Sequence, residues 1–493
     1  MFVVLLSNIQ SVFCSVKKLA ILIVCFLIPM GSLQGATSEK SQTIHLPKKV
    51  AHKNVSSKGF LNPSIQTLEN GLTVVVLQDQ RAPVVDVYVA YKVGGADDPE
   101  KQVGIAHYLE HVMFKGIPGL AENEFFESIQ RWGGSANAYT FLDGTVYEAE
   151  VPKQHLPKVL EWEGRRMQSL NLSDKAVESE QAVILAERSQ RTDGHYQSIV
   201  TQELFRQVFT NHPYRRPVIG WDETIKNTHK EHLLAFHQQF YRPSNAFLVL
   251  AGDITSEEAL KLAKQYFGHI PSSPPASLIT RVRPSEPKAA PGLSTRVQLK
   301  DERIQMPFLI KARPVSSYTP ETALLSRARD VLTYILTGLK SSFLSQKLVE
   351  EKKIALSVGV SHDDVMRDHG TFDIVLTPRQ GISLEAAEQA LDEEIQAFLK
   401  KGISQAEVTK AVQRFLIDRV FMKDDISACG GYLARLLSGE THINQLEKAE
   451  EEYGQVTAKM VMKEAHALLQ SMPVTLVALP KIKESLDKQN LTK

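Results

Sequence analysis

The feature that most restricts the fold of this 493-residue chain is a weak repetition of strand-like segments between its two halves. The segment LTVVVLQDQRAPVV, starting at residue 72, resembles STRVQLKDERIQMPF, starting at residue 294. Likewise, AFLVLAGDI at residue 246 resembles VTLVALPKI at residue 474. An offset of about 225 residues predicts two similar α+β domains, whereas chance resemblance between short apolar strands is the alternative.

Local patterns predict the elements of the first half. Two β-rich segments, 72–77 and 84–93, flank the turn QDQRAP and predict a hairpin or adjacent antiparallel strands. The stretch SANAYTFLDGTVYEAEV is also strand-like, and a further strand is expected at 246–251. Helical patterns are expected in three further regions, namely about 156–189, about 231–240 and 256–266.

The N-terminus has the pattern of a secretory signal. Lys17 and Lys18 precede the apolar run 19–28, and a small and polar stretch follows. This run is shorter than the roughly 20 residues that a membrane-spanning helix needs. We expect cleavage near Ala36 and secretion across an inner membrane into a periplasm, with an uncleaved membrane anchor as the alternative.

These patterns divide the chain into four parts. Residues 1–36 are the expected signal peptide, and 48–270 form the first domain, which carries the metal motif described below. The stretch 271–291 is rich in Pro and Ser and is the expected linker. Residues 292–493 form a second, similar domain without that motif.

Cysteine content and net charge narrow the chemistry. Of the three cysteines, Cys14 and Cys25 lie in the expected signal, and Cys429 alone can form neither an intrachain disulfide nor a thiolate zinc site. Any zinc must therefore be held by His and carboxylate groups. The formal net charge of +1 gives no indication of a nucleic-acid partner.

One motif carries metal chemistry, His107-Tyr108-Leu109-Glu110-His111. Residues four apart lie on one face of a helix, so His107 and His111 can point both imidazoles at a single ion. Glu110 lies beside them and can take a proton from a water molecule at the metal. This is the H-x-x-E-H order, the inverse of H-E-x-x-H, and a surface helix with two solvated histidines is the alternative.

A catalytic zinc needs a third protein ligand and an open position. The helical stretch 174–189 offers Glu178, Glu180 and Glu187, of which Glu180 and Glu187 are two helical turns apart and share a face. Carboxylates on a helix are usually solvated, so spacing alone does not select among them.

The chain resembles the pitrilysin- or insulinase-like (M16, inverzincin) zinc metallopeptidases of the half-length, two-domain bacterial type. That family places a third ligand 76 residues after the second motif histidine and a supporting carboxylate seven residues before that ligand. Here 187 − 111 = 76 and 187 − 180 = 7. The resemblance implies one zinc per chain, held by His107, His111 and Glu187, with Glu110 as the base and Glu180 supporting activity. It also implies two homologous α/β-sandwich domains, each an antiparallel-rich sheet with packed helices, that together form half of a clamshell.

A second resemblance concerns substrate binding. The segment GGSANAYTFLDGTVYEAEV is similar to the family's edge strand beside the zinc, to which an extended peptide would add through backbone hydrogen bonds. An ordinary buried strand is the alternative reading of this segment. The residues implied to contact substrate are Ser135, Ala136, Asn137, Ala138 and Tyr139.

One segment departs from the family pattern. Half-length relatives carry an Arg and a Tyr in the second domain that contact substrate and stabilise the oxyanion, but the aligned segment SSFLSQKLVEEKKIALSV has Phe343 and Leu356 there. Neither side chain can donate a hydrogen bond. We therefore expect a heterodimer with a similar, zinc-less chain that supplies the Arg and Tyr, with a homodimer or a monomer as the alternative.

The function expected from these features is zinc-dependent endopeptidase activity on peptides or extended polypeptides. Two other readings stay open at this point. A non-catalytic or scaffold subunit of a pitrilysin-like heterodimer would bind metal without cleaving peptides. A periplasmic metal-carrying protein would exchange its zinc and would have no need of a base such as Glu110.

Overall fold

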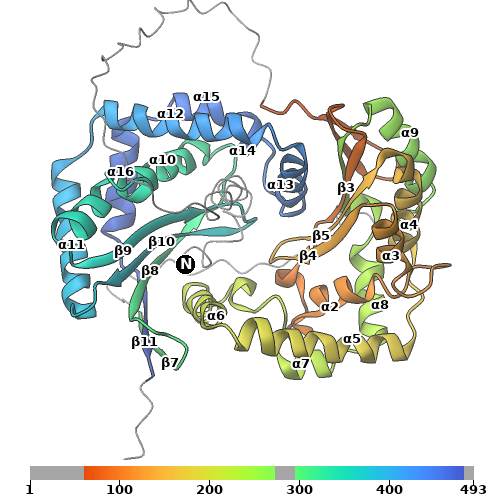
Figure 1. Cartoon of the computed structure of the whole chain (residues 1–493), viewed down its shortest axis with the longest axis horizontal. Coiled ribbons are helices and arrows are strands. Elements are labelled where there is room, and N and C mark those ends of the chain that lie inside the picture. The colour runs from red at the N-terminus through yellow and green to blue at the C-terminus, as the bar shows by residue number, and fades with distance from the viewer. Residues whose placement is uncertain (1–59, 273–294, 482–493) are drawn as a thin grey trace, which may run out of the picture.

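The computed structural model describes residues 60–272 and 295–481 (Figure 1). The expected signal 1–36, and all but the first two residues of the expected linker 271–291, lie outside the described residues. Among the helices that the model describes, none is long and apolar enough to span a membrane.

Each half of the chain forms one sheet (Figure 1). The strand order is β1-β2-β6-β3-β5-β4 in the first sheet and β7-β11-β8-β10-β9 in the second. The strands of the first sheet are β1 (Ser64–Thr67), β2 (Thr73–Gln78), β3 (Val84–Tyr91), β4 (Ser135–Thr140), β5 (Thr145–Pro152) and β6 (Ala246–Gly252). The strands of the second sheet are β7 (Arg296–Asp301), β8 (Phe308–Ser316), β9 (Ala355–Asp363), β10 (His369–Pro378) and β11 (Val474–Pro480).

The two sheets repeat one topology. Apart from β1, the orders coincide when β2 is matched with β7 and β6 with β11. The pairs β2–β6 and β7–β11 are parallel, and all other neighbouring pairs are antiparallel. The matched strands are those whose sequences resemble each other, so the prediction of two similar α+β domains is confirmed.

The prediction that segments 72–77 and 84–93 form a hairpin or adjacent strands is wrong. The strand β6 lies between β2 and β3, parallel to β2 and antiparallel to β3. The turn QDQRAP therefore crosses the end of β6. The pairing of β6 is invisible to local patterns, because this strand comes more than 150 residues later in the chain.

Helices cover both sheets. The helices of the first half are α2 (Ile105–Val112), α3 (Glu124–Arg131), α4 (Leu156–Gln168), α5 (Asp174–Glu187), α6 (Tyr196–Val208), α7 (Asp222–Lys226), α8 (Lys230–Phe240) and α9 (Ser256–Phe267). The helices of the second half are α10 (Ala323–Thr333), α11 (Leu384–Lys401), α12 (Gln405–Met422), α13 (Ile426–Ser438), α14 (Asn444–Glu447), α15 (Ala449–Gly454) and α16 (Ala458–Leu469). The region 156–189, expected to be helical throughout, is two helices, because Ser169 is extended and Ser173 caps α5 by accepting a hydrogen bond from Ala176 N.

The central strands are buried on both faces, which explains their continuous apolar runs. In β3, Val87 and Val89 face the helices of the same half, whereas Tyr88 and Ala90 face the opposite side, as side-chain alternation requires. The opposite side is covered by α13, which comes from the second half (Figure 1).

The second half receives a helix in return. The strands β8 and β11 pack one face against Val200, Leu204 and Val208 of α6, which comes from the first half (Figure 1). The close approach of α13 to the first sheet requires Gly430, since a Cβ there would lie 2.8 Å from the Tyr88 ring and 3.0 Å from Ala251 Cβ. The two halves therefore share their cores.

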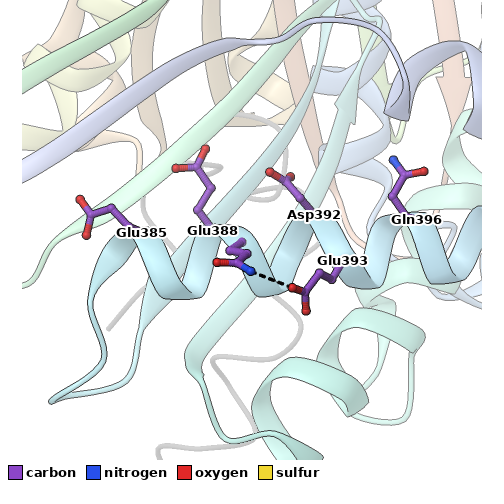
Figure 2. A pocket seen from close by; sticks show the side chains of 6 residues that line it. Glu385, Glu388, Asp392, Glu393 and Gln396 are labelled. Atoms are coloured by element: carbon purple, nitrogen blue, oxygen red, sulfur yellow. Dashed lines mark hydrogen bonds between the residues drawn. The ribbon is translucent and has the colours of Figure 1, made fainter.

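A shallow hollow lies beside α11, where Glu385, Glu388 and Asp392 project from one side of the helix (Figure 2). Lys311 contacts both Glu388 and Asp392, at 3.2 and 2.6 Å. Arg296 also contacts Glu388, at 2.9 Å. These cations from β7 and β8 pair with Glu388 and Asp392 and join α11 to the sheet, so we regard these two carboxylates as structural.

Candidate active site

The start of helix α2 is held in place by Asp98 and Gly104. Asp98 is buried, and its carboxylate accepts hydrogen bonds from Gly104 N at 2.6 Å and Ala106 N at 3.1 Å. Gly104 has a φ of 100°, and a Cβ there would lie 2.7 Å from Gly220 Cα. Only glycine fits this position, and the start of α2 is set by it.

The helix α5 brings two carboxylates toward α2 on a buried face. Val177, Glu180, Ile184 and Glu187 recur at intervals of three or four residues, so they share that face. The Tyr108 hydroxyl donates a hydrogen bond of 2.7 Å to Val177 O and joins the two helices. Glu180 and Glu187 thus point toward the motif instead of toward solvent.

His107, His111 and Glu187 come together with one ligand atom each, all within 4.8 Å of one another. Within the described part of the chain, no other set of three His, Cys, Asp or Glu residues meets this condition. Glu187 Oε2 lies 3.8 Å from His107 Nε2 and 3.2 Å from His111 Nε2. Tetrahedral zinc with bonds of about 2.0–2.1 Å separates its ligands by about 3.4 Å, so these three atoms fit the ion.

Glu180 supports the cluster from outside. Its Oε2 lies 3.1 Å from His111 Nδ1, the ring nitrogen opposite the one that faces Glu187. Burial lowers the pKa of His111, but hydrogen bonds with Glu180 and Glu187 outweigh burial and raise it to about 9. The hydrogen bond from His111 lowers the pKa of Glu187, and burial lowers that of His107. The two carboxylates thus favour a positive charge at the cluster, and a zinc ion bound there would take the place of the proton on His111.

Glu110 lies beside the cluster and is only 8% exposed. Thr140, the last residue of β4, donates a hydrogen bond of 2.5 Å to Glu110 Oε2. Burial raises the pKa of Glu110 to about 7, which suits a group that takes up and releases a proton near neutral pH. Sequence reasoning missed Thr140, because no spacing pattern shows that its hydroxyl faces Glu110.

The implied substrate strand is β4, an edge strand paired only with β5 among the described residues. Ser135 and Asn137 are exposed, whereas Ala136 and Ala138 pack against the core of the first domain. Tyr139 is half-buried and packs toward the other face of the sheet. The unpaired edge of β4 therefore ends at Thr140, beside Glu110, and an extended peptide could pair with this edge.

The positions of the missing Arg and Tyr lie in the second domain. The Phe343 ring packs against Phe398, with ring centroids 5.2 Å apart. Leu356 lies on β9 and is 47% exposed. Neither position offers a polar group.

Two histidines and a carboxylate from neighbouring helices, with a buried glutamate beside them, make the geometry of a mononuclear zinc hydrolase site. Two family models match consecutive parts of the chain. One, described as insulinase (peptidase family M16), matches residues 73–222, and the other, described as the peptidase M16 inactive domain, matches residues 228–415.

Individual proteins agree with these models. The chain is 31% identical over 401 residues to the zinc protease PqqE of Helicobacter pylori, which covers 80% of this chain and 83% of that protein. A crystal structure of a protease from Helicobacter pylori matches with a TM-score of 0.75 and 26% identity, covering 85% of this chain and 99% of that one. The periplasmic protease PqqL from Escherichia coli matches in fold, with a TM-score of 0.73 and 19% identity, over 90% of this chain but 49% of that one.

The chain therefore belongs to the M16 family of peptidases. The resemblance inferred from the H-x-x-E-H motif is confirmed. So is the expected fold, two similar sheet-and-helix domains that correspond to half of the longer clamshell members.

Proposed function

We propose that this chain is a zinc-dependent endopeptidase acting on peptides or extended polypeptides. The observation that carries the proposal is Glu110, a buried carboxylate held by Thr140 beside three atoms that fit a zinc ion. Family membership supports peptidase activity, and the zinc proteases among the relatives support the metal. A protein that only carried zinc would not need a base at this place.

In the proposed mechanism each residue has a distinct task. His107, His111 and Glu187 would hold the zinc ion, which when bound would act as a Lewis acid and lower the pKa of a water molecule. Glu110 takes the proton of the attacking water and later gives it to the leaving amine, while Thr140 fixes the orientation of its carboxylate. The edge of β4, Ser135 to Tyr139, holds the substrate as an added strand. Glu180 keeps His111 in the ring orientation that presents Nε2 to the metal.

We further propose secretion into a periplasm and pairing with a zinc-less homologous chain. The pairing is supported by Phe343 and Leu356, which cannot stabilise an oxyanion, and by the length of PqqL, of which this chain covers 49%. A partner that carries Arg and Tyr at the corresponding positions would complete the site. A homodimer is the alternative.

The alternative function is that of a scaffold subunit, which the apolar residues at 343 and 356 favour. The test is hydrolysis of an unfolded, fluorescently labelled polypeptide by the zinc-loaded chain, alone and with proteins that co-purify from the native host. The proposal expects chelator-sensitive cleavage in at least one of these samples. Stoichiometric zinc with no cleavage in the native complex would favour the scaffold function.

A further inference from the structure

Lys115 has no part in the proposed chemistry, yet its ammonium group lies against the metal cluster. It follows α2 by three residues, and its Nζ is 3.3 Å from Glu180 Oε1. The other oxygen of that carboxylate, Oε2, is 3.1 Å from His111 Nδ1. Lys115, Glu180 and His111 thus form an uninterrupted chain of polar contacts that ends at the metal ligands.

The contact between Lys115 and Glu180 is largely shielded from water. The Lys115 side chain is 20% exposed and that of Glu180 is 10% exposed. Charge pairs in such surroundings interact more strongly than surface pairs, which water screens. The comparable contact of Arg191 Nη1 with Glu187 Oε1, at 2.8 Å, involves an arginine that is 79% exposed and is therefore the weaker of the two.

A second contact holds the lysine in place. Lys115 Nζ donates a hydrogen bond of 3.2 Å to Asn123 Oδ1 at the start of α3. The ammonium group thus contacts both α5, through Glu180, and the start of α3, through Asn123. A carboxylate with one oxygen fixed in this way directs its other oxygen toward the imidazole.

We infer that Lys115 is a positioning residue of the metal site, an inference that rests on the proposed function only in taking His111 as a zinc ligand. By holding Glu180, Lys115 fixes the ring orientation and tautomer in which His111 offers Nε2 to the ion. Carboxylates that bind the second nitrogen of a ligand histidine commonly affect metal affinity by 10- to 100-fold. A lysine one layer further out should affect it by about 10-fold.

The experiment measures zinc affinity of the full chain by competition with a chromogenic chelator, and the visible spectrum of the Co²⁺-substituted chain. Lys115→Met should raise the zinc dissociation constant by about 10-fold and alter the cobalt absorption bands. Lys115→Arg, which keeps the positive charge, should retain most of the zinc affinity. Lys352→Met is the control, because Lys352 contacts the largely buried Glu394 at 2.7 Å in the second domain. This control should leave both readouts unchanged.

Unchanged zinc affinity and an unchanged cobalt spectrum in Lys115→Met would overturn the inference. If Lys115→Met does not fold, Lys115→Gln replaces it, because glutamine keeps hydrogen-bond donors but lacks the charge. Weaker zinc affinity in Lys115→Gln would support the inference, and unchanged affinity would overturn it. Because neither readout needs turnover, a wild-type chain that binds zinc but cleaves no peptide refutes the proposed function alone. Loss of affinity in Lys115→Met would support the inference even then.

Discussion

The helices α2 and α10 occupy equivalent positions in the two domains, but the charged groups around them are paired differently. The helix α2 follows β3 and precedes β4, and α10 follows β8 and precedes β9. On α2, His107 and His111 meet Glu187, and the nearby cations contact only the outer oxygens of Glu180 and Glu187.

On α10, the charges are complementary. Arg327 donates to Glu452 at 3.0 Å, and Asp330 lies 3.0 Å from His362 Nδ1. The Tyr453 hydroxyl donates to the other oxygen of Asp330 at 2.8 Å. The charged groups of this cluster pair with one another, although His362 Nε2 lies 3.8 Å from Asp364 and makes no hydrogen bond. We therefore expect the α10 cluster to stabilise the fold without any ion, whereas we propose that the α2 cluster binds one.

The largest expected effect separates chemistry from metal binding in the α2 cluster. Glu110→Gln removes the base but none of the three ligands, so kcat should fall by about 1,000-fold while zinc content stays near one per chain. Peptide hydrolysis and metal analysis on the same preparation check this. Near-normal turnover in the variant would show that another group takes the proton.

A substitution in the α10 cluster should lower the stability of the fold and leave zinc binding unchanged. Arg327→Met leaves the buried Glu452 without its cation, which should cost about 3–5 kcal/mol in the free energy of unfolding. Zinc affinity measured on the folded variant should be unchanged. Denaturant unfolding and chelator competition give the two values, and a loss of zinc affinity would mean that the two clusters are coupled.

The packing of α13 on the first sheet should be sensitive to substitution of Gly430. Gly430→Ala places a methyl group 2.8 Å from the Tyr88 ring and 3.0 Å from Ala251, so α13 must shift away from the first sheet. Overpacking of this kind should cost about 1–3 kcal/mol. Gly454→Ala is the matched control, because a Cβ there meets nothing within 4 Å. Equal unfolding free energies for the two variants would contradict the close packing of α13.

The last prediction concerns the difference between two pH values in the stability contributed by His362. Burial lowers the pKa of His362, but Asp364 and Asp330 outweigh burial and raise it above its usual value. A raised pKa means that protonated His362 stabilises the fold at low pH, and that this contribution is lost as the pH rises through the raised pKa. His362→Gln should therefore cost about 1–3 kcal/mol at pH 6 and less at pH 9. An equal cost at both values, measured by urea unfolding, would indicate that packing alone is involved.

Three residues of the candidate metal site could be predicted from the sequence alone. His107, Glu110 and His111 follow from helical spacing, since the geometry of one helix is local. Glu187 could not be selected from Glu178 and Glu180 by spacing, because its place depends on how α5 packs on α2 through Tyr108 and Val177. Only the family resemblance identified it.

Other features depend on contacts between distant segments and left no local pattern. The insertion of β6 between β2 and β3 depends on pairing with a strand more than 150 residues away. The roles of Thr140 and Lys115 depend on where β4 and α5 lie relative to α2. The exchange of α6 and α13 between the domains is equally nonlocal.

We propose that α2 and α5 hold one zinc ion through His107, His111 and Glu187. Anomalous diffraction at the zinc absorption edge, on crystals of the zinc-loaded chain, tests it most directly. We expect one strong peak about 2.0–2.2 Å from His107 Nε2, His111 Nε2 and Glu187 Oε2. A zinc-loaded crystal with no peak there, or with its peak at other residues, would show that these three residues do not form the zinc site.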